Sequence, residues 1–127
     1  MKNYINLSDI EDLKTLIHDA RGMKSNPSEE KPGKGKTLGM LFFNPSLRTR
    51  LSTEKAARLL GMEVMVMNAD KDGWALEFED GAIMNSDKAE HIKEAAAVLS
   101  QYCDIIAVRA FPGLKDREKD ETEVVMK

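Results

Sequence analysis

The sequence has a single cysteine, Cys103, and no long hydrophobic run. One thiol cannot form a disulfide within the chain, and the longest apolar stretch is well short of the roughly 20 residues that span a bilayer. The N-terminal MKNYINLSD lacks the apolar segment of a signal peptide. We therefore expect a soluble cytoplasmic protein without membrane contact, in which Cys103 is a buried thiol rather than a nucleophile.

Neither sign of charge dominates, since 19 basic and 22 acidic residues leave a formal charge of -3. The basic residues are spread along the chain, so the basic groove that nucleic acid requires is missing. His18 and His91 lie on predicted helix surfaces without a cysteine or histidine at ligand spacing. We expect no nucleic-acid partner, no metal and no other cofactor.

Length and composition predict one domain, whose N-terminal quarter contains one predicted helix. A chain of 127 residues, 42% hydrophobic, favours a single domain with one modest core. Apolar residues at helical spacing predict an amphipathic helix over about residues 8–21 that buries one face. The charged segment 24–36, with its Pro and Gly residues, predicts a surface loop.

Strands and helices alternate along the rest of the chain. Short apolar runs predict strands at residues 37–43, 62–68 and 104–110. Helical spacing predicts one helix between Ser46 and Gly61 and another over about residues 88–102. Their predicted buried residues are Leu51, Ala56, Leu59 and Leu60 in the first helix, and Ile92, Ala96, Leu99 and Tyr102 in the second. This alternation predicts an α/β fold, a three-layer parallel sheet with helices on both faces.

The segment NPSLRTR follows the first strand, at the end of a parallel sheet where ligands bind. Ser46 is a predicted helix cap, and Arg48 and Arg50 fall in the first turn beside free backbone N–H groups. Two cations there are unfavourable without an anion, and a phosphate would also meet the hydroxyls of Ser46 and Thr49. The sequence predicts a bound anion. The alternative is an ordinary cap whose arginines pair with acids on other elements.

Arg109 and Trp74 are the two further candidates, each with an alternative. Arg109 ends an apolar strand, where its charge needs a partner: either a ligand oxygen or an ion pair with Asp104 or Asp116. Trp74 is the only tryptophan and lies in a polar loop over residues 68–86. Taken alone, it is better explained as an anchor packed on its own domain than as a contact for a ligand or another subunit.

The segment FFNPSLRTRLSTEKAARLLGMEV resembles the Ser-x-Arg-Thr-Arg carbamoyl phosphate loop of the aspartate and ornithine transcarbamylases, with the family's following helix and strand. The later YCDIIAVR resembles the segment that ends in the family's second phosphate-binding arginine. Together with the loop between them, the resemblance covers nearly the whole chain. It implies that residues 1–127 form the N-terminal, carbamoyl phosphate-binding domain of that family.

Within the family the chain is most similar to the branch that carbamoylates N-succinylornithine or N-acetylornithine in arginine biosynthesis. Leu47 replaces the threonine usual in ornithine enzymes, and DGWALEFEDGAIMNSDKAEH resembles a loop whose indole reaches the carbamoyl phosphate of a neighbouring subunit. The resemblance implies a homotrimer when full length, with Arg48, Thr49 and Arg109 as catalytic residues. It implies that carbamoyl phosphate is bound by Ser46, the backbone of Leu47, Arg48, Thr49, Arg109 and the neighbour's Trp74.

Ala89 is a departure from both kinds of relative in this branch. The succinyl-type enzymes typically have proline at this position, and the acetyl-type enzymes have glutamate. Alanine leaves room for the longer succinyl group and has no carboxylate to repel it. The position therefore favours N-succinylornithine over N-acetylornithine or ornithine.

The implied chemistry is attack of the substrate's side-chain amine on the carbonyl carbon, which gives a tetrahedral intermediate that expels phosphate. The family's His-Pro-x-Gln and His-Cys-Leu-Pro motifs, which polarise the carbonyl and hold the amino acid, are missing, and the chain stops within DETEVVMK. We therefore expect an inactive fragment whose missing domain would bind the N-acylated ornithine. The alternative is a non-catalytic phosphate-binding or interaction domain of the same fold.

Overall fold

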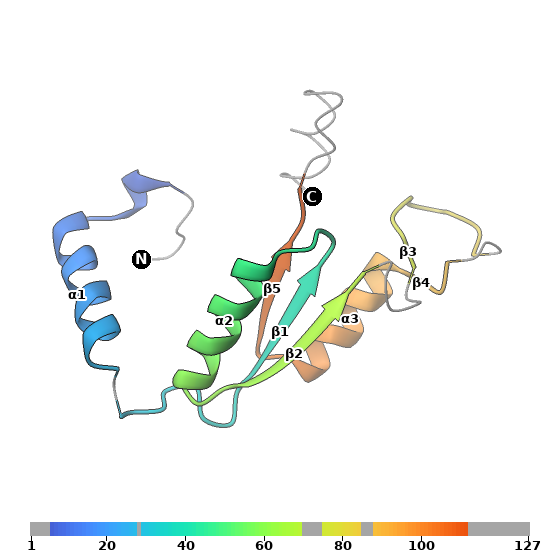
Figure 1. Cartoon of the computed structure of the whole chain (residues 1–127). Coiled ribbons are helices and arrows are strands. Elements are labelled where there is room, and N and C mark those ends of the chain that lie inside the picture. The colour runs from blue at the N-terminus through green and yellow to red at the C-terminus, as the bar shows by residue number, and fades with distance from the viewer. Residues whose placement is uncertain (1–5, 28, 70–74, 85–87, 112–127) are drawn as a thin grey trace. The chain divides into compact units, whose positions relative to one another are not determined.

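The computed structural model of the chain has two compact units, Met1–Lys31 and Pro32–Lys127, and each is described by itself (Figure 1). No helix among the described residues is long and apolar enough to cross a membrane. The structure describes residues 6–27, 29–69, 75–84 and 88–111.

The first unit contains a short 3-10 helix, η1 (Leu7–Asp9), and an α-helix, α1 (Leu13–Ser25). The prediction of a single helix over residues 8–21 was wrong. The side chains of Asn6 and Asp12 each accept a hydrogen bond from a backbone N–H of the turn that follows. Because each cap satisfies the start of its own helix, the chain forms two helical segments in place of one.

The predicted buried face of this helix is not formed within its own unit, where no residue of α1 is buried. Leu13, Leu16 and Ile17 are all exposed. A unit made of one helical turn and one helix has too little chain to cover an apolar stripe. The loop predicted over residues 24–36 starts later in the structure than predicted, because α1 continues to Ser25.

The second unit is built on a parallel sheet of β1 (Thr37–Phe42), β2 (Glu63–Asn68) and β5 (Ile105–Arg109), in the order β2-β1-β5. These strands confirm the three predicted runs. A second, two-stranded parallel sheet pairs β3 (Leu76–Glu77) with β4 (Glu90–His91). This small sheet was not predicted, because strands of two residues are too short to show a periodic pattern.

Two helices cover the sheet, α2 (Leu47–Leu59) and α3 (Ile92–Tyr102). Ala57 of α2 packs against one face of β1, and Ala95 of α3 shares a cluster with Leu41 on the other face. The β1 residues that face α2 are Leu38, Met40 and Phe42. Because neighbouring strand residues point to opposite faces, the helices lie on opposite sides of the sheet (Figure 1). The predicted three-layer α/β fold is confirmed.

The helix faces were predicted less well than the helices themselves. Four residues predicted to be buried in the first of these helices are exposed: Leu51, Ala56 and Leu59 of α2, and Leu60 at its C-terminal cap. Ala57 is buried in their place, and in α3 the buried alanine is Ala95 rather than Ala96, while Tyr102 is exposed. Two predicted α3 residues do pack against the core, Ile92 and Leu99. When apolar side chains occupy several sides of a helix, spacing alone does not select the face that meets the sheet.

Cys103 is buried, as predicted, where α3 leads into β5. Its thiol lies against the middle of β1: a Cβ built on Gly39 would lie 2.6 Å from Cys103 Sγ. Only glycine leaves room for the sulfur at this position. The close approach fixes the end of α3 against the central strand.

Candidate anion-binding site

The carboxyl ends of the three main strands lie side by side. Phe42 at the end of β1 is in register with Asn68 of β2 and with Arg109 of β5. The turn from β1 to α2 starts at this edge, and Phe43 N–H donates to the Arg109 carbonyl at 2.9 Å. Trp74 lies outside the described residues.

The segment after Trp74 reaches the same edge. The Phe78 ring meets the Phe43 ring edge-on, with 5.7 Å between centroids. Ala89 is exposed, and its N–H donates to the Ala75 carbonyl at 2.9 Å, beside the β3–β4 pairing. Ala89, the residue expected to influence acceptor choice, therefore belongs to a segment that contacts the turn.

The start of α2 presents free backbone donors. Ser46 has extended backbone angles, φ -156 and ψ 111, and its Oγ accepts from Thr49 N–H at 3.3 Å. This is the predicted cap. The N–H groups of Leu47 and Arg48 come before Arg50, whose N–H donates to the Ser46 carbonyl as the first donor of the helix, so they have no intrahelical acceptor and can donate to a ligand. The Leu47 side chain is exposed and apolar, so the polar group that this residue offers to a ligand is its backbone N–H.

Arg48 and Arg50 add positive charge to this helix start. Both are exposed, and neither forms an ion pair with the residues that the structure describes. The first turn contains no acid, and Glu54, one turn later, pairs with Arg58 at 2.9 Å. The alternative in which the two arginines are neutralised by acids is therefore not seen within the described part of the chain.

Arg109 connects β5 to the helix start. Its Nη1 donates to Thr49 Oγ1 at 3.1 Å, and Ser46 Oγ donates to the same oxygen at 3.0 Å. A hydroxyl oxygen has two acceptor positions, and both are occupied here. The Thr49 hydroxyl proton is therefore free to donate to a ligand.

The Nε of Arg109 has no hydrogen-bond partner among the described residues. Among the described residues, Nε of Arg109 is the one buried side-chain nitrogen or oxygen without a hydrogen bond. The Phe111 ring lies against the guanidinium, 4.3 Å from Cζ to the ring centroid. Buried donors in native proteins nearly always have acceptors, so this Nε–H is a donor that a bound anion, or water in its absence, would satisfy.

The alternative ion pair between Arg109 and Asp104 is contradicted, because Asp104 lies at the opposite end of β5. Its Oδ1 binds Lys36 Nζ at 2.7 Å and its Oδ2 accepts from Thr37 N–H at 2.8 Å. The lysine hydrogen bond, followed by the Thr37 hydrogen bond, lowers the pKa of Asp104. Asp116, the other acid considered, lies outside the described residues.

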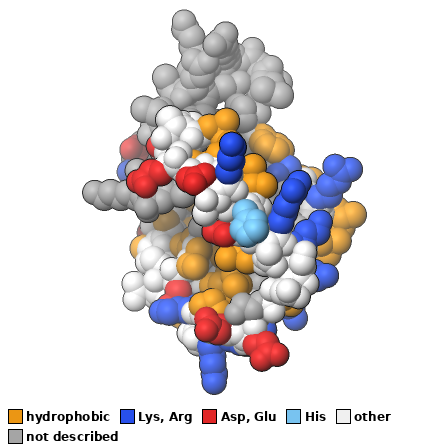
Figure 2. Space-filling model, turned by 90° about the vertical axis from the view of Figure 1, so that its left-hand side faces the viewer, with side chains coloured by type: hydrophobic (Ala, Val, Ile, Leu, Met, Phe, Trp, Pro, Cys, Tyr) orange, Lys and Arg blue, Asp and Glu red, His pale blue; other side chains and the backbone are white. Residues whose placement is uncertain are grey.

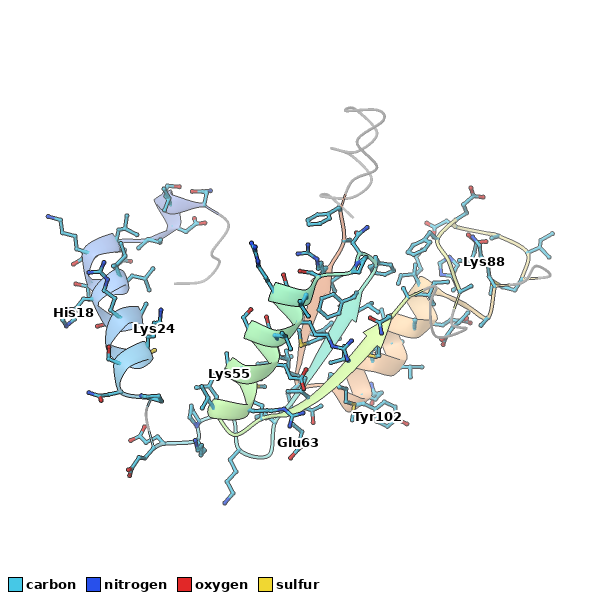
Figure 3. All side chains as sticks on the ribbon, viewed as in Figure 1. His18, Lys24, Lys55, Glu63, Lys88 and Tyr102 are labelled. Carbon is cyan, nitrogen blue, oxygen red and sulfur yellow. The ribbon has the colours of Figure 1, made fainter. Side chains whose placement is uncertain are left out.

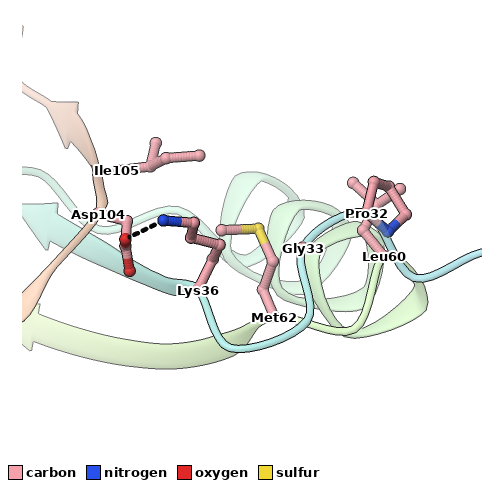
Figure 4. Close-up of a pocket in the computed structure, with 7 residues that line it drawn as sticks. All are labelled: Pro32, Gly33, Lys36, Leu60, Met62, Asp104 and Ile105. Atoms are coloured by element: carbon pink, nitrogen blue, oxygen red, sulfur yellow. Dashed lines mark hydrogen bonds and ion pairs between the residues drawn. The ribbon is translucent and has the colours of Figure 1, made fainter.

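A cavity of about 380 Å³ opens beside the ion pair of Lys36 and Asp104 (Figure 4). Its walls are mainly apolar and include Leu60, Met62 and Ile105. The one cation in its lining, Lys36, is already neutralised by Asp104. Figure 3 marks the same end of the sheet by Glu63 at the start of β2. This cavity therefore differs from the carboxyl ends of the strands, where Arg48, Arg50 and Arg109 form no ion pair with a described residue.

Lys and Arg side chains are interspersed with acidic and hydrophobic ones on the face drawn in Figure 2. Within the described ranges, no group of three or more His, Cys, Asp and Glu residues could hold a metal ion.

Two neighbours of the site were missed from the sequence, Asn44 and Phe111. Asn44 Oδ1 accepts from Phe111 N–H at 2.7 Å, and Phe111 in turn packs on Arg109. Neither residue belongs to a periodic pattern. The only available signal was position, since one follows β1 and the other follows β5 within two residues.

Comparison with known proteins identifies the family. The family model described as aspartate/ornithine carbamoyltransferase, carbamoyl-P binding domain, matches residues 2–126. The chain belongs to this family. The resemblance noted in the sequence is thereby confirmed, and it extends over the segments outside the anion-binding motif.

Individual carbamoyltransferases are also similar. N-succinylornithine carbamoyltransferase of Bacteroides thetaiotaomicron is 46% identical over 127 residues, which cover 99% of this chain and 40% of the relative. N-acetylornithine carbamoyltransferase of Xanthomonas campestris pv. campestris is 41% identical over 129 residues, covering 100% of this chain and 38% of the relative. The chain thus spans about 40% of the length of the carbamoyltransferases it matches.

A solved carbamoyltransferase shares the fold. It is a glutamate-to-valine variant of N-acetyl-L-ornithine transcarbamylase, complexed with carbamyl phosphate and N-succinyl-L-norvaline. It superposes with a TM-score of 0.81 at 41% identity, covering 98% of this chain and 38% of that one. This agreement supports the α/β arrangement described above.

Proposed function

We propose that this chain is the carbamoyl phosphate-binding domain, residues 1–127, of a cytoplasmic carbamoyltransferase of arginine biosynthesis. The complete protein would transfer the carbamoyl group to the side-chain amine of N-succinylornithine. The observation that carries the proposal is the junction of Ser46, Thr49 and Arg109 at the start of α2, where the buried Nε of Arg109 has no acceptor among the described residues.

The phosphate would be held by donors of three kinds. Backbone N–H groups of Leu47 and Arg48 lie at the helix start, and the hydroxyls of Thr49 and Ser46 lie beside them; Ser46, which donates to Thr49 in this structure, would turn its proton to the phosphate on binding. The guanidinium groups of Arg48 and Arg109 add charge-assisted hydrogen bonds, which are stronger than those between neutral groups. In a homotrimer, Trp74 of a neighbouring subunit would complete the site.

In the transfer reaction, the amine nitrogen forms a bond to the carbonyl carbon, and the carbon–oxygen bond to phosphate then breaks. Phosphate leaves with the electron pair of that bond and accepts the proton that the attacking amine gives up. The helix start, Arg48 and Arg109 would stabilise the negative charge that grows on the leaving phosphate. The Thr49 hydroxyl would donate a hydrogen bond to the carbonyl or phosphate oxygen. Donors fixed before the reaction stabilise such charge without further reorganisation.

The choice of amine is the finer part of the proposal and depends on Ala89. Variants of N-acetyl-L-ornithine transcarbamylase with alanine, serine or proline in place of a glutamate are also solved with N-succinyl-L-norvaline. By the family resemblance, Ala89 occupies the place of an acetyl-type glutamate. An uncharged side chain there would not repel the succinyl carboxylate, which supports N-succinylornithine as the acceptor.

The phosphate site is tested by titrating the protein with carbamoyl phosphate while following thermal stability. A ligand at about 100 times its Kd stabilises the folded state by about 2.7 kcal/mol. Arg48→Ala should remove most of this stabilisation, whereas Lys55→Ala should retain it, because Lys55 is an exposed cation further along the same helix (Figure 3). An equal shift in Arg48→Ala would contradict the assignment.

The acceptor is tested by assaying the complete protein with N-succinylornithine, N-acetylornithine and ornithine. The proposal predicts the highest kcat/KM for the succinyl compound. Preference for unmodified ornithine would contradict it. Binding of carbamoyl phosphate without transfer to any of the three amines would favour a non-catalytic phosphate-binding domain.

A further inference from the structure

We infer that Asn44 is a positioning residue that acts on Arg109 through Phe111. This inference rests on the proposed function, because it concerns how the phosphate-binding arginine is held. Asn44 precedes the Ser-x-Arg-Thr-Arg segment and is not among the residues expected to contact carbamoyl phosphate. Its contact is instead with the backbone beyond β5.

The first step is the pair of contacts between the β1–α2 turn and the end of β5. Phe43 N–H donates to the Arg109 carbonyl at 2.9 Å, and Asn44 Oδ1 accepts from Phe111 N–H at 2.7 Å. The second bond joins residues 67 positions apart and lies beyond the last paired residue of the sheet. Consecutive turn residues therefore hold the chain on both sides of Ala110.

The second step is the aromatic ring. Phe111 is 56% exposed, so packing alone does not fix its side chain. Its ring nevertheless lies 4.3 Å from the Arg109 guanidinium, within the range of a cation–π interaction. The Asn44 hydrogen bond fixes the Phe111 backbone and thereby places the ring against one face of the guanidinium.

The third step concerns the orientations that these contacts leave to the Arg109 guanidinium. Thr49 occupies Nη1, the ring occupies one face, and Nε is buried without an acceptor. A group restrained on these sides has few orientations left, so little rotamer freedom is lost when it meets an anion. The arrangement is therefore preorganised, with Asn44 as its most distant support.

The residue type is consistent with this role. The Phe111 N–H requires an acceptor, which aspartate would also provide. A carboxylate beside a phosphate site would, however, oppose anion binding, because like charges repel across a short distance. The asparagine amide gives the same acceptor without the charge.

The test uses the complete protein and measures the KM for carbamoyl phosphate, the KM for the amine, and the melting temperature. Asn44→Ala should raise the KM for carbamoyl phosphate about two- to tenfold, the effect of losing one hydrogen bond. The KM for the amine should not change. Asn26→Ala, at the end of α1, is the matched control and should change neither constant.

Two further variants separate positioning from a general structural effect. In a Phe111→Leu background, Asn44→Ala should add little, because both changes remove the same support of Arg109. Asn44→Asp keeps the acceptor but adds a negative charge, so its increase in the KM for carbamoyl phosphate should shrink at high salt, which screens the repulsion. The increase caused by Asn44→Ala should persist at high salt.

An unchanged KM for carbamoyl phosphate in Asn44→Ala would overturn the inference while leaving the proposed function intact. Additive effects of Asn44→Ala and Phe111→Leu, or equal changes in both KM values, would also overturn it. If the unaltered protein does not bind carbamoyl phosphate, both the proposed function and the inference fail.

Discussion

The two ends of the parallel sheet each contain a cation from a strand or its flanking residue, but only the cation at the amino end pairs with an acid among the described residues. At the amino end, Lys36 and Asp104 neutralise each other at 2.7 Å. At the carboxyl end, Arg109 contacts a hydroxyl and an aromatic ring, and its buried Nε has no partner among the described residues. The difference separates Lys36, whose charge is neutralised where two strands begin, from Arg109, which has a donor that a ligand could occupy.

The largest expected effect is on catalysis and comes from removing the Arg109 guanidinium. Arg109→Ala in the complete protein should lower kcat/KM for carbamoyl phosphate by about 10²–10³, as removal of a preorganised donor does. Steady-state kinetics measure this effect. Asp104→Asn, at the other end of β5, is the matched control and should leave kcat/KM nearly unchanged. Similar losses in both variants would remove the distinction between the two ends.

A smaller catalytic effect is expected from the hydroxyl that connects Arg109 to α2. Thr49→Val keeps the side-chain shape but removes the acceptor for Arg109 and the free hydroxyl proton. We expect a loss of about tenfold or more in kcat/KM, since it removes about one to two hydrogen bonds. Thr53→Val, one turn along α2, is the control. Equal activity of Thr49→Val and the unaltered protein would contradict a role for this hydroxyl.

The centre of β1 supports both ends, so damage there should not discriminate between them. Gly39→Ala would bring a methyl group to 2.6 Å from Cys103 Sγ. Overpacking of this kind destabilises a protein by about 1–3 kcal/mol. Chemical denaturation should show this loss, and a second change, Cys103→Ala, should recover part of it. Failure of the second change to recover stability would contradict the close contact.

The smallest effect is expected from pH at the amino end. The Lys36 hydrogen bond holds the pKa of Asp104 below its ordinary value of 3.8. Its contribution to stability is therefore present above pH 3.8 and is lost as pH falls through the lower folded pKa. The melting temperature of Asp104→Asn should fall less steeply in this range than that of the unaltered protein. Parallel profiles would show that Asp104 has no such linkage.

Local signals explain what could be predicted from the sequence. The three strands are short apolar runs between turn residues, and Ser46 marks a helix start, while the two early arginines that follow it predict an anion site. The Arg109 position followed from the end of a strand. These features depend on residues close together in the chain, so their pattern survives without knowledge of the fold.

Other features depend on contacts that leave no local pattern. Asn44 meets Phe111 across 67 positions, and Ala57 faces the sheet although larger apolar residues lie elsewhere on the same helix. The break between η1 and α1 arises because Asp12 caps a second helix within an apolar periodic segment. The predicted contribution of Trp74 lies outside the described residues and stays a prediction.

The most direct test of the central claim follows the Nε–H resonances of the arginine side chains by NMR while inorganic phosphate, and then carbamoyl phosphate, is added. The Arg109 Nε–H signal should shift and saturate with the ligand, because that donor has no acceptor within the described protein. The Arg58 signal should stay in place, since Arg58 pairs with Glu54. An Arg109 signal that does not move at saturating ligand, or that moves no more than Arg58, would contradict an anion site at the carboxyl end of the sheet.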